Sequence, residues 1–368
     1  MTKLKQTPLL EEHKKLNAKI IDFGGWLMPV QYTNVIDEHT TTRTKAGLFD
    51  ICHMGEFQIK GPDAKKFINK IITNNIENLV PNKAFYTCMC YENGTIIDDL
   101  FVYCFNDNNY IFVVNAGNIN KDLEWIKQHK GEFNVEIKDI SDETAKLDIQ
   151  GQESEKILQK LTKTNLQDLK RFHFTEDNIE DIKTIISRTG YTAEEGFELY
   201  FDSKEAPLIW NKLLEVGKEF GLKPIGLGAR DTLRIEAGYS LYGHELNNKI
   251  TPLEADIGFT VKLDKEEFIS KQSLTEQKQN LKRKIMAFEM IDKAIPRENY
   301  KILKDDSEIG FVTSGTFSPT FKKGLGMGMI NIEHAKEDNE IYILVREKKY
   351  KAKIVHKPIY EFCSKNKG

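Results

Sequence analysis

The chain has 368 residues, more than one ordinary hydrophobic core accommodates, so its length indicates two or three domains. Hydrophobic residues make up 40% and charged residues 30% of the chain, which is typical of a globular protein and excludes a disordered one. With 53 basic and 56 acidic residues the formal net charge is -3, so no general attraction to nucleic acid or to a membrane surface is expected. No apolar run approaches the length of a membrane span, and we expect a cytoplasmic protein.

Three segments carry the apolar spacing of amphipathic helices, namely residues 63–72, 119–129 and 203–220. Ser203 is expected as the N-cap of the third, and Gly221 as its stop. Runs rich in β-branched and aromatic residues predict strands at 95–104, 110–114, 146–150, 184–192 and 197–201. Because helices and strands do not alternate regularly, we expect an α+β fold with largely antiparallel sheets.

The last part of the chain differs from the rest. A polar stretch, 275–284, precedes candidate strands at 285–290, 310–314, 325–330 and 341–345. Their spacing predicts a small β-barrel or sandwich. We therefore expect a first region at 1–280 and a β-rich domain at 281–368.

No motif for a nucleotide or a metal is present. The chain lacks the glycine-rich patterns of dinucleotide and P-loop sites, and its eight histidines are scattered. The five cysteines are odd in number and form no CxxC pair, so no zinc site and no disulfide framework is expected.

Two adjacent aspartates follow the hairpin signal Asn93-Gly94. Strand alternation puts Asp99 on one face with Phe101 and Tyr103, where a carboxylate beside aromatic rings could serve a flat polar heterocycle. Asp98 falls on the aliphatic face instead. The alternative is that both aspartates only cap the turn, and from the residues alone this reading is favoured.

A third carboxylate, Glu198, alternates with Phe197 and Leu199 and so faces away from their core. A carboxylate can accept two parallel hydrogen bonds from a ring N–H and its neighbouring amine, which is the edge that a pterin presents. The alternative is an exposed strand glutamate.

The segment 226–239 predicts a short helix that stops at Gly238, with Arg230 and Arg234 one turn apart. Both arginines could bind an anion or a polar ring, or they could form a solvated ion-pair face. His53 is expected to be a packed residue rather than a base. The segment 313–319 is expected to be a polar turn without a nucleophile.

These stretches together resemble the glycine cleavage T-protein (aminomethyltransferase) family over almost the whole chain. The resemblance rests on the order and spacing of motifs at 7–9, 22–30, 43–54, 97–100, 190–192, 226–238, 241–243, 251–254 and 313–320. One departure is Ala193-Glu194-Glu195-Gly196, where the family commonly has Gly-Glu-Asp-Gly. Alanine requires a negative φ more strictly than glycine, so the geometry of this turn is expected to differ.

The resemblance implies a three-lobed folate-binding fold, with two interleaved lobes in 1–280 and the tail as a β-barrel lobe. It implies that Asp99 is the catalytic residue nearest the reacting folate nitrogens, and that Glu198 and Arg230 hold the pterin. The other residues that it places along the folate channel are Met54, Tyr86, Tyr103, Asn115, Tyr191 and Tyr239.

The activity that the resemblance implies is transfer of a one-carbon unit from aminomethyl-lipoyl H-protein to tetrahydrofolate, with release of ammonia. Lipoylated H-protein is then the expected partner, and no metal is needed. A folate-dependent demethylase is the first alternative. The second is a non-enzymatic folate-binding factor of iron–sulfur assembly, but its Lys-Gly-Cys-Tyr-x-Gly-Gln-Glu motif is absent from this sequence.

Overall fold

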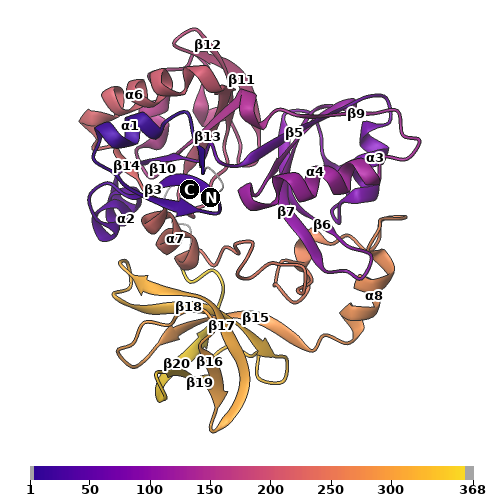
Figure 1. The fold of residues 1–368 in the computed structure, drawn as a ribbon, viewed down its shortest axis with the longest axis vertical. Coiled ribbons are helices and arrows are strands. Elements are labelled where there is room, and N and C mark those ends of the chain that lie inside the picture. The colour runs from indigo at the N-terminus through magenta and orange to yellow at the C-terminus, as the bar shows by residue number, and fades with distance from the viewer. Residues whose placement is uncertain (1–3, 361–368) are drawn as a thin grey trace. The chain divides into compact units, whose positions relative to one another are not determined.

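A computed structural model describes residues 4–360 of the chain (Figure 1). These residues form α-helices and mainly antiparallel sheets, which confirms the α+β prediction. Strand β1 pairs in parallel with β3, and β14 pairs in parallel with β4. Contacts divide the chain into two compact units. The first contains residues 1–67, 77–85 and 101–231, and the second contains 68–76, 86–100 and 232–368. The division into 1–280 and 281–368 stays a prediction.

The first unit contains a three-stranded sheet of β1 (Lys5–Gln6), β3 (Trp26–Gln31) and β2 (Lys19–Phe23). In the chain, α1 (Leu10–Lys15) lies between β1 and β2, and α2 (Val35–Thr44) follows β3. Its main element is a six-stranded sheet in the order β11 (Phe174–Ile179), β12 (Ile182–Ser187), β13 (Gly196–Asp202), β10 (Thr144–Gln150), β4 (Gly47–Asp50) and β14 (Lys223–Ile225).

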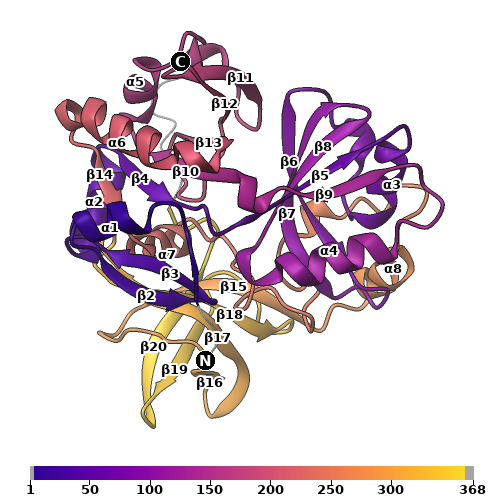
Figure 2. The same ribbon diagram turned by 45° about the horizontal axis from the view of Figure 1, so that its top comes forward.

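One face of the six-stranded sheet is apolar and is covered by α6 (Ala206–Gly217), with α5 (Ser154–Gln159) nearby (Figure 2). Leu147 of β10 and Leu199 of β13 pack with Trp210 of α6, and all three are fully buried. Alternation along each strand therefore sends the intervening side chains to the opposite face. That face holds the polar residues described below.

A five-stranded sheet follows the order β6 (Lys83–Cys90), β7 (Ile96–Asn106), β8 (Asn109–Val114), β5 (Gly55–Lys60) and β9 (Glu136–Asp139). Its β6 and β7 continue from one unit into the other. Helices α3 (Ala64–Ile71) and α4 (Ile119–Gln128) match the predicted helices. The Asn93-Gly94 turn is confirmed, since Gly94 has φ 85° and its amide donates to the carbonyl of Tyr91.

The second unit contains a closed six-stranded barrel, which confirms the β-rich tail (Figure 1). Its order is β15 (Arg283–Met290), β18 (Lys323–Asn331), β17 (Ser307–Ser318), β16 (Lys301–Lys304), β19 (Glu340–Val345) and β20 (Lys348–Val355). Aliphatic residues and Phe288 fill its interior. Before it lie α7 (Leu227–Glu236), which begins in the first unit, and α8 (Lys271–Gln279).

Several local expectations were wrong. A polar turn was expected at 313–319, but residues 313–318 form the end of β17 (Ser307–Ser318). The polar stretch 275–284 is partly helical, because α8 runs to Gln279. The third predicted helix begins with a 3₁₀ turn, Ser203–Glu205, whose N-cap is Asp202 and not Ser203; the carboxylate of Asp202 accepts from the amide of Lys204. The stop at Gly221 is confirmed by its φ of 73°.

Candidate functional site

The candidate site in the first unit lies on the polar face of β10 and β13. Asp148 is directly opposite Glu198 in the antiparallel register, and Lys146 is opposite Tyr200. Directly opposed residues project from the same face of a sheet, with Cβ atoms about 4.5–5.5 Å apart. All four side chains are buried, so the exposed-glutamate alternative for Glu198 was wrong.

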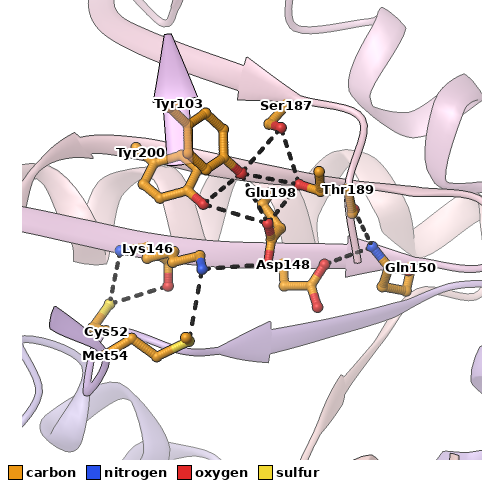
Figure 3. Close-up of polar contacts among 10 residues, drawn as sticks. All are labelled: Cys52, Met54, Tyr103, Lys146, Asp148, Gln150, Ser187, Thr189, Glu198 and Tyr200. Atoms are coloured by element: carbon orange, nitrogen blue, oxygen red, sulfur yellow. Dashed lines mark hydrogen bonds and ion pairs between the residues drawn. The ribbon is translucent and has the colours of Figure 1, made fainter. Parts of the chain in front are cut away.

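The carboxylate of Glu198 accepts hydrogen bonds from several donors (Figure 3). Oε2 accepts from Thr189 and, at 3.3 Å each, from the hydroxyls of Tyr103 and Tyr200. Oε1 lies 3.3 Å from the ammonium of Lys146. We call Tyr103, Lys146, Asp148, Thr189, Glu198 and Tyr200 the Glu198 cluster.

The two carboxyl groups of this cluster differ in protonation. Burial pushes the pKa of Glu198 up, but the Lys146 ammonium and the hydrogen bonds from Thr189, Lys146 and Tyr103 outweigh burial and hold it below its usual value. Burial and the charge of Glu198 raise the pKa of Asp148 well above its usual range. Like charges this close do not both ionise readily, so Glu198 carries the charge and Asp148 the proton.

Two further titratable groups nearby are uncharged. Burial, and then the charge of Arg230, lower the pKa of His53 to about 3, so its imidazole is neutral at physiological pH. Its ring packs edge-on against Phe23 with centroids 5.8 Å apart, as expected of a packed histidine. Burial raises the pKa of Glu56 to about 8, against the opposing charge of Lys146.

Met54 and Tyr103, both predicted to line the folate channel, are brought to this cluster. The sulfur of Met54 lies 3.6 Å from the ammonium of Lys146. The hydroxyl of Tyr103 donates to Glu198 and accepts from Tyr200 at 2.9 Å. A thioether and an aromatic ring beside an ionised carboxylate suit a flat ring with a polar edge.

Arg230 and Tyr191 form a second pair in the same unit. The guanidinium of Arg230 lies over the ring of Tyr191, 4.6 Å from its centroid. Tyr191 precedes the turn at Ala193, which has φ 59°, so the expectation of a negative φ there was wrong. Arg43 holds this turn, donating to the carbonyl of Thr192 at 2.5 Å and to the carboxylate of Glu194 at 2.9 Å. Tertiary contacts thus impose on alanine the left-handed conformation that glycine adopts freely.

Asp99 lies in the second unit, near the start of β7. Its Oδ2 accepts a 2.9 Å hydrogen bond from the hydroxyl of Tyr86, another predicted channel residue. Asp98 is fully buried whereas Asp99 is partly exposed, in agreement with the strand alternation. The catalytic role of Asp99 stays a prediction.

The remaining predicted residues lie next to helix ends. Asn115 follows β8 and accepts, through its carbonyl, the amide of Asn118 in the next turn. Tyr239 follows Gly238, whose φ of 68° ends α7 as expected. Binding roles for Asn115 and Tyr239 stay predictions.

Arg234 does not act as the sequence suggested. Only 2% of the Arg234 surface is exposed. Its guanidinium forms an ion pair with Glu245 at 2.9 Å and donates to the hydroxyl of Ser314 at 2.7 Å, and all three residues belong to the second unit. Thr313 donates to the other oxygen of Glu245 at 2.6 Å. We call Arg234, Glu245, Thr313 and Ser314 the Arg234 cluster, and its pairing excludes both a solvated face and anion binding by Arg234.

Sequence reasoning missed Lys146, Asp148, Thr189 and Tyr200. One signal was available: in β10 the polar residues Lys146, Asp148 and Gln150 alternate with Ala145, Leu147 and Ile149. Such alternation usually indicates a solvated face, so only the pairing with β13 shows that these residues are buried.

Other classes of site find no support in residues 4–360. No group of three or more histidine, cysteine, aspartate or glutamate side chains there could hold a metal ion. In the same range no helix is long and apolar enough to span a membrane. Cys52, Cys88, Cys90 and Cys104 are buried free thiols, and Cys363 lies outside the described residues.

The fold and the cluster define an α+β protein with a closed C-terminal barrel and a buried carboxylate, Glu198, that accepts several hydrogen bonds. Residues 9–265 match the family described as the GCVT N-terminal domain, and residues 283–361 match the glycine cleavage T-protein C-terminal barrel domain. The chain belongs to the glycine cleavage T-protein family of aminomethyltransferases.

Relatives and a solved structure agree with this membership. The aminomethyltransferase of Thermoanaerobacter pseudethanolicus is 52% identical over 363 residues, covering 98% of this chain and 99% of that one. That of Alkaliphilus metalliredigens is 50% identical over 364 residues, with the same coverage of both chains. The crystal structure of glycine cleavage system aminomethyltransferase T from Bartonella henselae is similar with a TM-score of 0.91 and 29% identity, covering 97% of this chain and 98% of that one.

Proposed function

We propose that this chain transfers the one-carbon unit of an aminomethyl group, carried on the lipoyl arm of H-protein, to tetrahydrofolate in the cytoplasm. The products are ammonia, the dihydrolipoyl arm and 5,10-methylenetetrahydrofolate. Family membership supports the reaction. The observation that carries the folate site is Glu198, a buried carboxylate kept ionised by Lys146.

The reaction balances without an oxidant or a metal. The C–N bond of S–CH₂–NH₂ breaks and the nitrogen leaves as ammonia, while the C–S bond breaks and the sulfur leaves as a thiol. The carbon forms new bonds to N5 and N10 of the folate. The two protons that these nitrogens lose go to the ammonia and to the thiolate.

In this proposal Glu198 accepts hydrogen bonds from the 2-amino and N3–H groups of the pterin, because an ionised acceptor prefers paired N–H donors. Arg230 lies over Tyr191 and provides a flat cationic wall. Met54, Tyr86, Tyr103, Asn115, Tyr191 and Tyr239 complete the proposed folate contacts.

Asp99 acts on the reacting atoms in this proposal. A cationic methylene intermediate develops positive charge that a nearby carboxylate stabilises, and the same carboxylate orients N10. The hydroxyl of Tyr86, which donates to Oδ2 of Asp99, fixes the direction of that carboxylate.

The test is ammonia release from aminomethylated H-protein, measured with and without tetrahydrofolate. We expect tetrahydrofolate to accelerate release strongly. No acceleration together with demethylation of a small methylated amine would replace the proposal with a demethylase. Folate binding without either reaction would indicate a non-enzymatic folate-binding protein.

A further inference from the structure

The Glu198 cluster contains one carboxyl group more than the binding of a pterin's N–H edge requires. Asp148 lies directly across from Glu198, and only 2% of it is exposed. Its side chain points to the same face of the sheet, as Figure 3 shows. A buried second acid beside an ionised one is costly unless it has a defined protonation state and partner.

The hydrogen bonds around Asp148 fix which of its oxygens is an acceptor. Gln150 donates from Nε2 to Oδ1 of Asp148 at 2.7 Å and to the carbonyl of Thr189 at 3.0 Å. Thr192 donates to Oε1 of Gln150 at 2.8 Å, which fixes the orientation of that amide. Oδ1 of Asp148 is therefore an acceptor, and a proton on this carboxyl group belongs on Oδ2.

The surrounding charges place that proton on Asp148 rather than on Glu198. The groups that face Asp148 are the carboxylate of Glu198, the ammonium of Lys146 and the guanidinium of Arg230. Lys146 makes its ion pair with Glu198, at 3.3 Å. Within residues 4–360, Oδ1 of Asp148 accepts a hydrogen bond and Oδ2 makes none. The face thus offers an ionised acceptor with a carboxylic acid O–H donor beside it.

We propose that Asp148 is a specificity-determining residue that donates from Oδ2 to the 4-oxo oxygen of the pterin while Glu198 accepts its 2-amino and N3–H groups. This inference rests on the proposed function. In a 4-oxo pterin the N–H donors and the carbonyl acceptor lie side by side along one edge, which complements an acceptor next to a donor. A 2,4-diamino ring presents an amine at position 4, so the O–H of Asp148 then faces a donor.

The experiment measures the affinities of folic acid and of its 4-amino counterpart aminopterin by calorimetry, for the full-length chain and its variants. We expect the unaltered chain to prefer folic acid, and Asp148→Ala to reduce that preference at least tenfold. Asp148→Asn should keep much of the preference, because its amide still accepts from Gln150 and donates in place of the O–H. Asp202→Asn, at the exposed end of β13, is the matched control and should change neither affinity.

A pH series gives a second readout that does not depend on whether Asp148→Ala folds. Affinity for folic acid should fall as rising pH ionises Asp148 in the unaltered chain, and this fall should be absent from Asp148→Asn. An unchanged folic acid preference in Asp148→Ala, or the same pH profile in Asp148→Asn, would overturn the inference. If the unaltered chain binds neither compound nor tetrahydrofolate, the proposed function itself fails.

Discussion

The Glu198 cluster and the Arg234 cluster are both buried and charged, yet they are built differently. In the Arg234 cluster one guanidinium pairs with one carboxylate. Ser314 accepts a hydrogen bond from the guanidinium, and Thr313 donates one to the carboxylate. In the Glu198 cluster one ammonium meets two carboxyl groups, and one of these keeps a proton. We call the Arg234 cluster balanced, because its basic and acidic groups are equal in number, and the Glu198 cluster unbalanced. A balanced cluster stabilises the fold, whereas an unbalanced one retains a hydrogen-bonding group for a ligand.

The largest expected effect tests the balanced cluster. Arg234→Met leaves the buried charge of Glu245 without its cation, so we expect a loss of about 3–5 kcal/mol in the free energy of unfolding. Denaturant unfolding measures it, with Lys301→Ala as control. Lys301 pairs with Glu308 in the same unit, but both side chains are more than half exposed, so a change below about 1 kcal/mol is expected.

A double variant sharpens this prediction. Arg234→Met combined with Glu245→Leu removes both charges and should recover part of the lost stability. Full stability in the single variant would mean that Glu245 does not depend on Arg234.

The next effect concerns Asp99, a carboxylate proposed to act on the reaction rather than on the fold. Asp99→Asn should fold normally and lose about 10²–10³-fold in single-turnover transfer from H-protein, because the charge facing the cationic intermediate is gone. Asp98→Asn is the matched control and should act mainly on the melting temperature, since Asp98 is fully buried. An active Asp99→Asn beside a stable but inactive Asp98→Asn would reverse the assignment.

Glu198→Gln tests the unbalanced cluster directly. It keeps the shape but removes the charge and one acceptor, so folate binding should weaken by roughly 1–3 kcal/mol in calorimetry. Unchanged affinity would remove Glu198 from the folate site.

The pH dependence of stability tests the raised pKa of Glu56. Its pKa is raised to about 8 in the folded chain, so between its ordinary value of 4.5 and about 8 the folded state binds more protons than the unfolded state. The contribution of Glu56 to the free energy of unfolding is therefore fully present below pH 4.5 and is lost as the pH rises towards 8. Glu56→Gln, which cannot ionise, should gain roughly 1–3 kcal/mol over the unaltered chain between pH 5 and 8. Parallel stability curves for the two proteins would contradict this.

The smallest expected effect concerns backbone strain at positive φ, for which each cluster has one residue nearby. Gly238, which follows Arg234 in the chain, has φ 68°, a conformation that costs glycine little. Ala193, between β12 and β13, has φ 59° and carries a Cβ. Ala193→Gly should therefore raise the free energy of unfolding by about 1 kcal/mol, measured by denaturant titration. A decrease would mean that the methyl group's packing outweighs the backbone strain.

Local pattern predicted much of the fold. The Asn93-Gly94 turn, the stops at Gly221 and Gly238 and the helices near 64–71 and 119–128 depend on neighbouring residues, and all are confirmed. Within the barrel, strands β16 and β20 were missed because β16 is short and β20 is rich in lysine. Residues 313–318 looked like a turn because they are polar, but carboxylates of Glu245 and Glu236 accept from Thr313 and Ser318 within the strand.

The candidate site was predicted only in part, for a related reason. Alternation within β13 placed Glu198 on the correct face. Its partners on β10 are about fifty positions earlier in the chain, and no local pattern reveals which residue of β10 meets it. The register that pairs Asp148 with Glu198 is a tertiary property, so the protonated acid beside the predicted carboxylate was not foreseen.

The second unit is built from segments far apart in the sequence, which affects how the chain folds during its synthesis. Its segments 68–76 and 86–100 leave the ribosome long before 232–368, which supply the rest of the unit. Cys88, Cys90 and Ile96 pack against Ile285 and Met327 of the barrel strands. At about 5–20 residues per second, roughly 15–50 seconds separate residue 100 from the last residue. The pace of translation, more than the strength of the finished core, then sets how long these apolar strands stay without the residues that cover them.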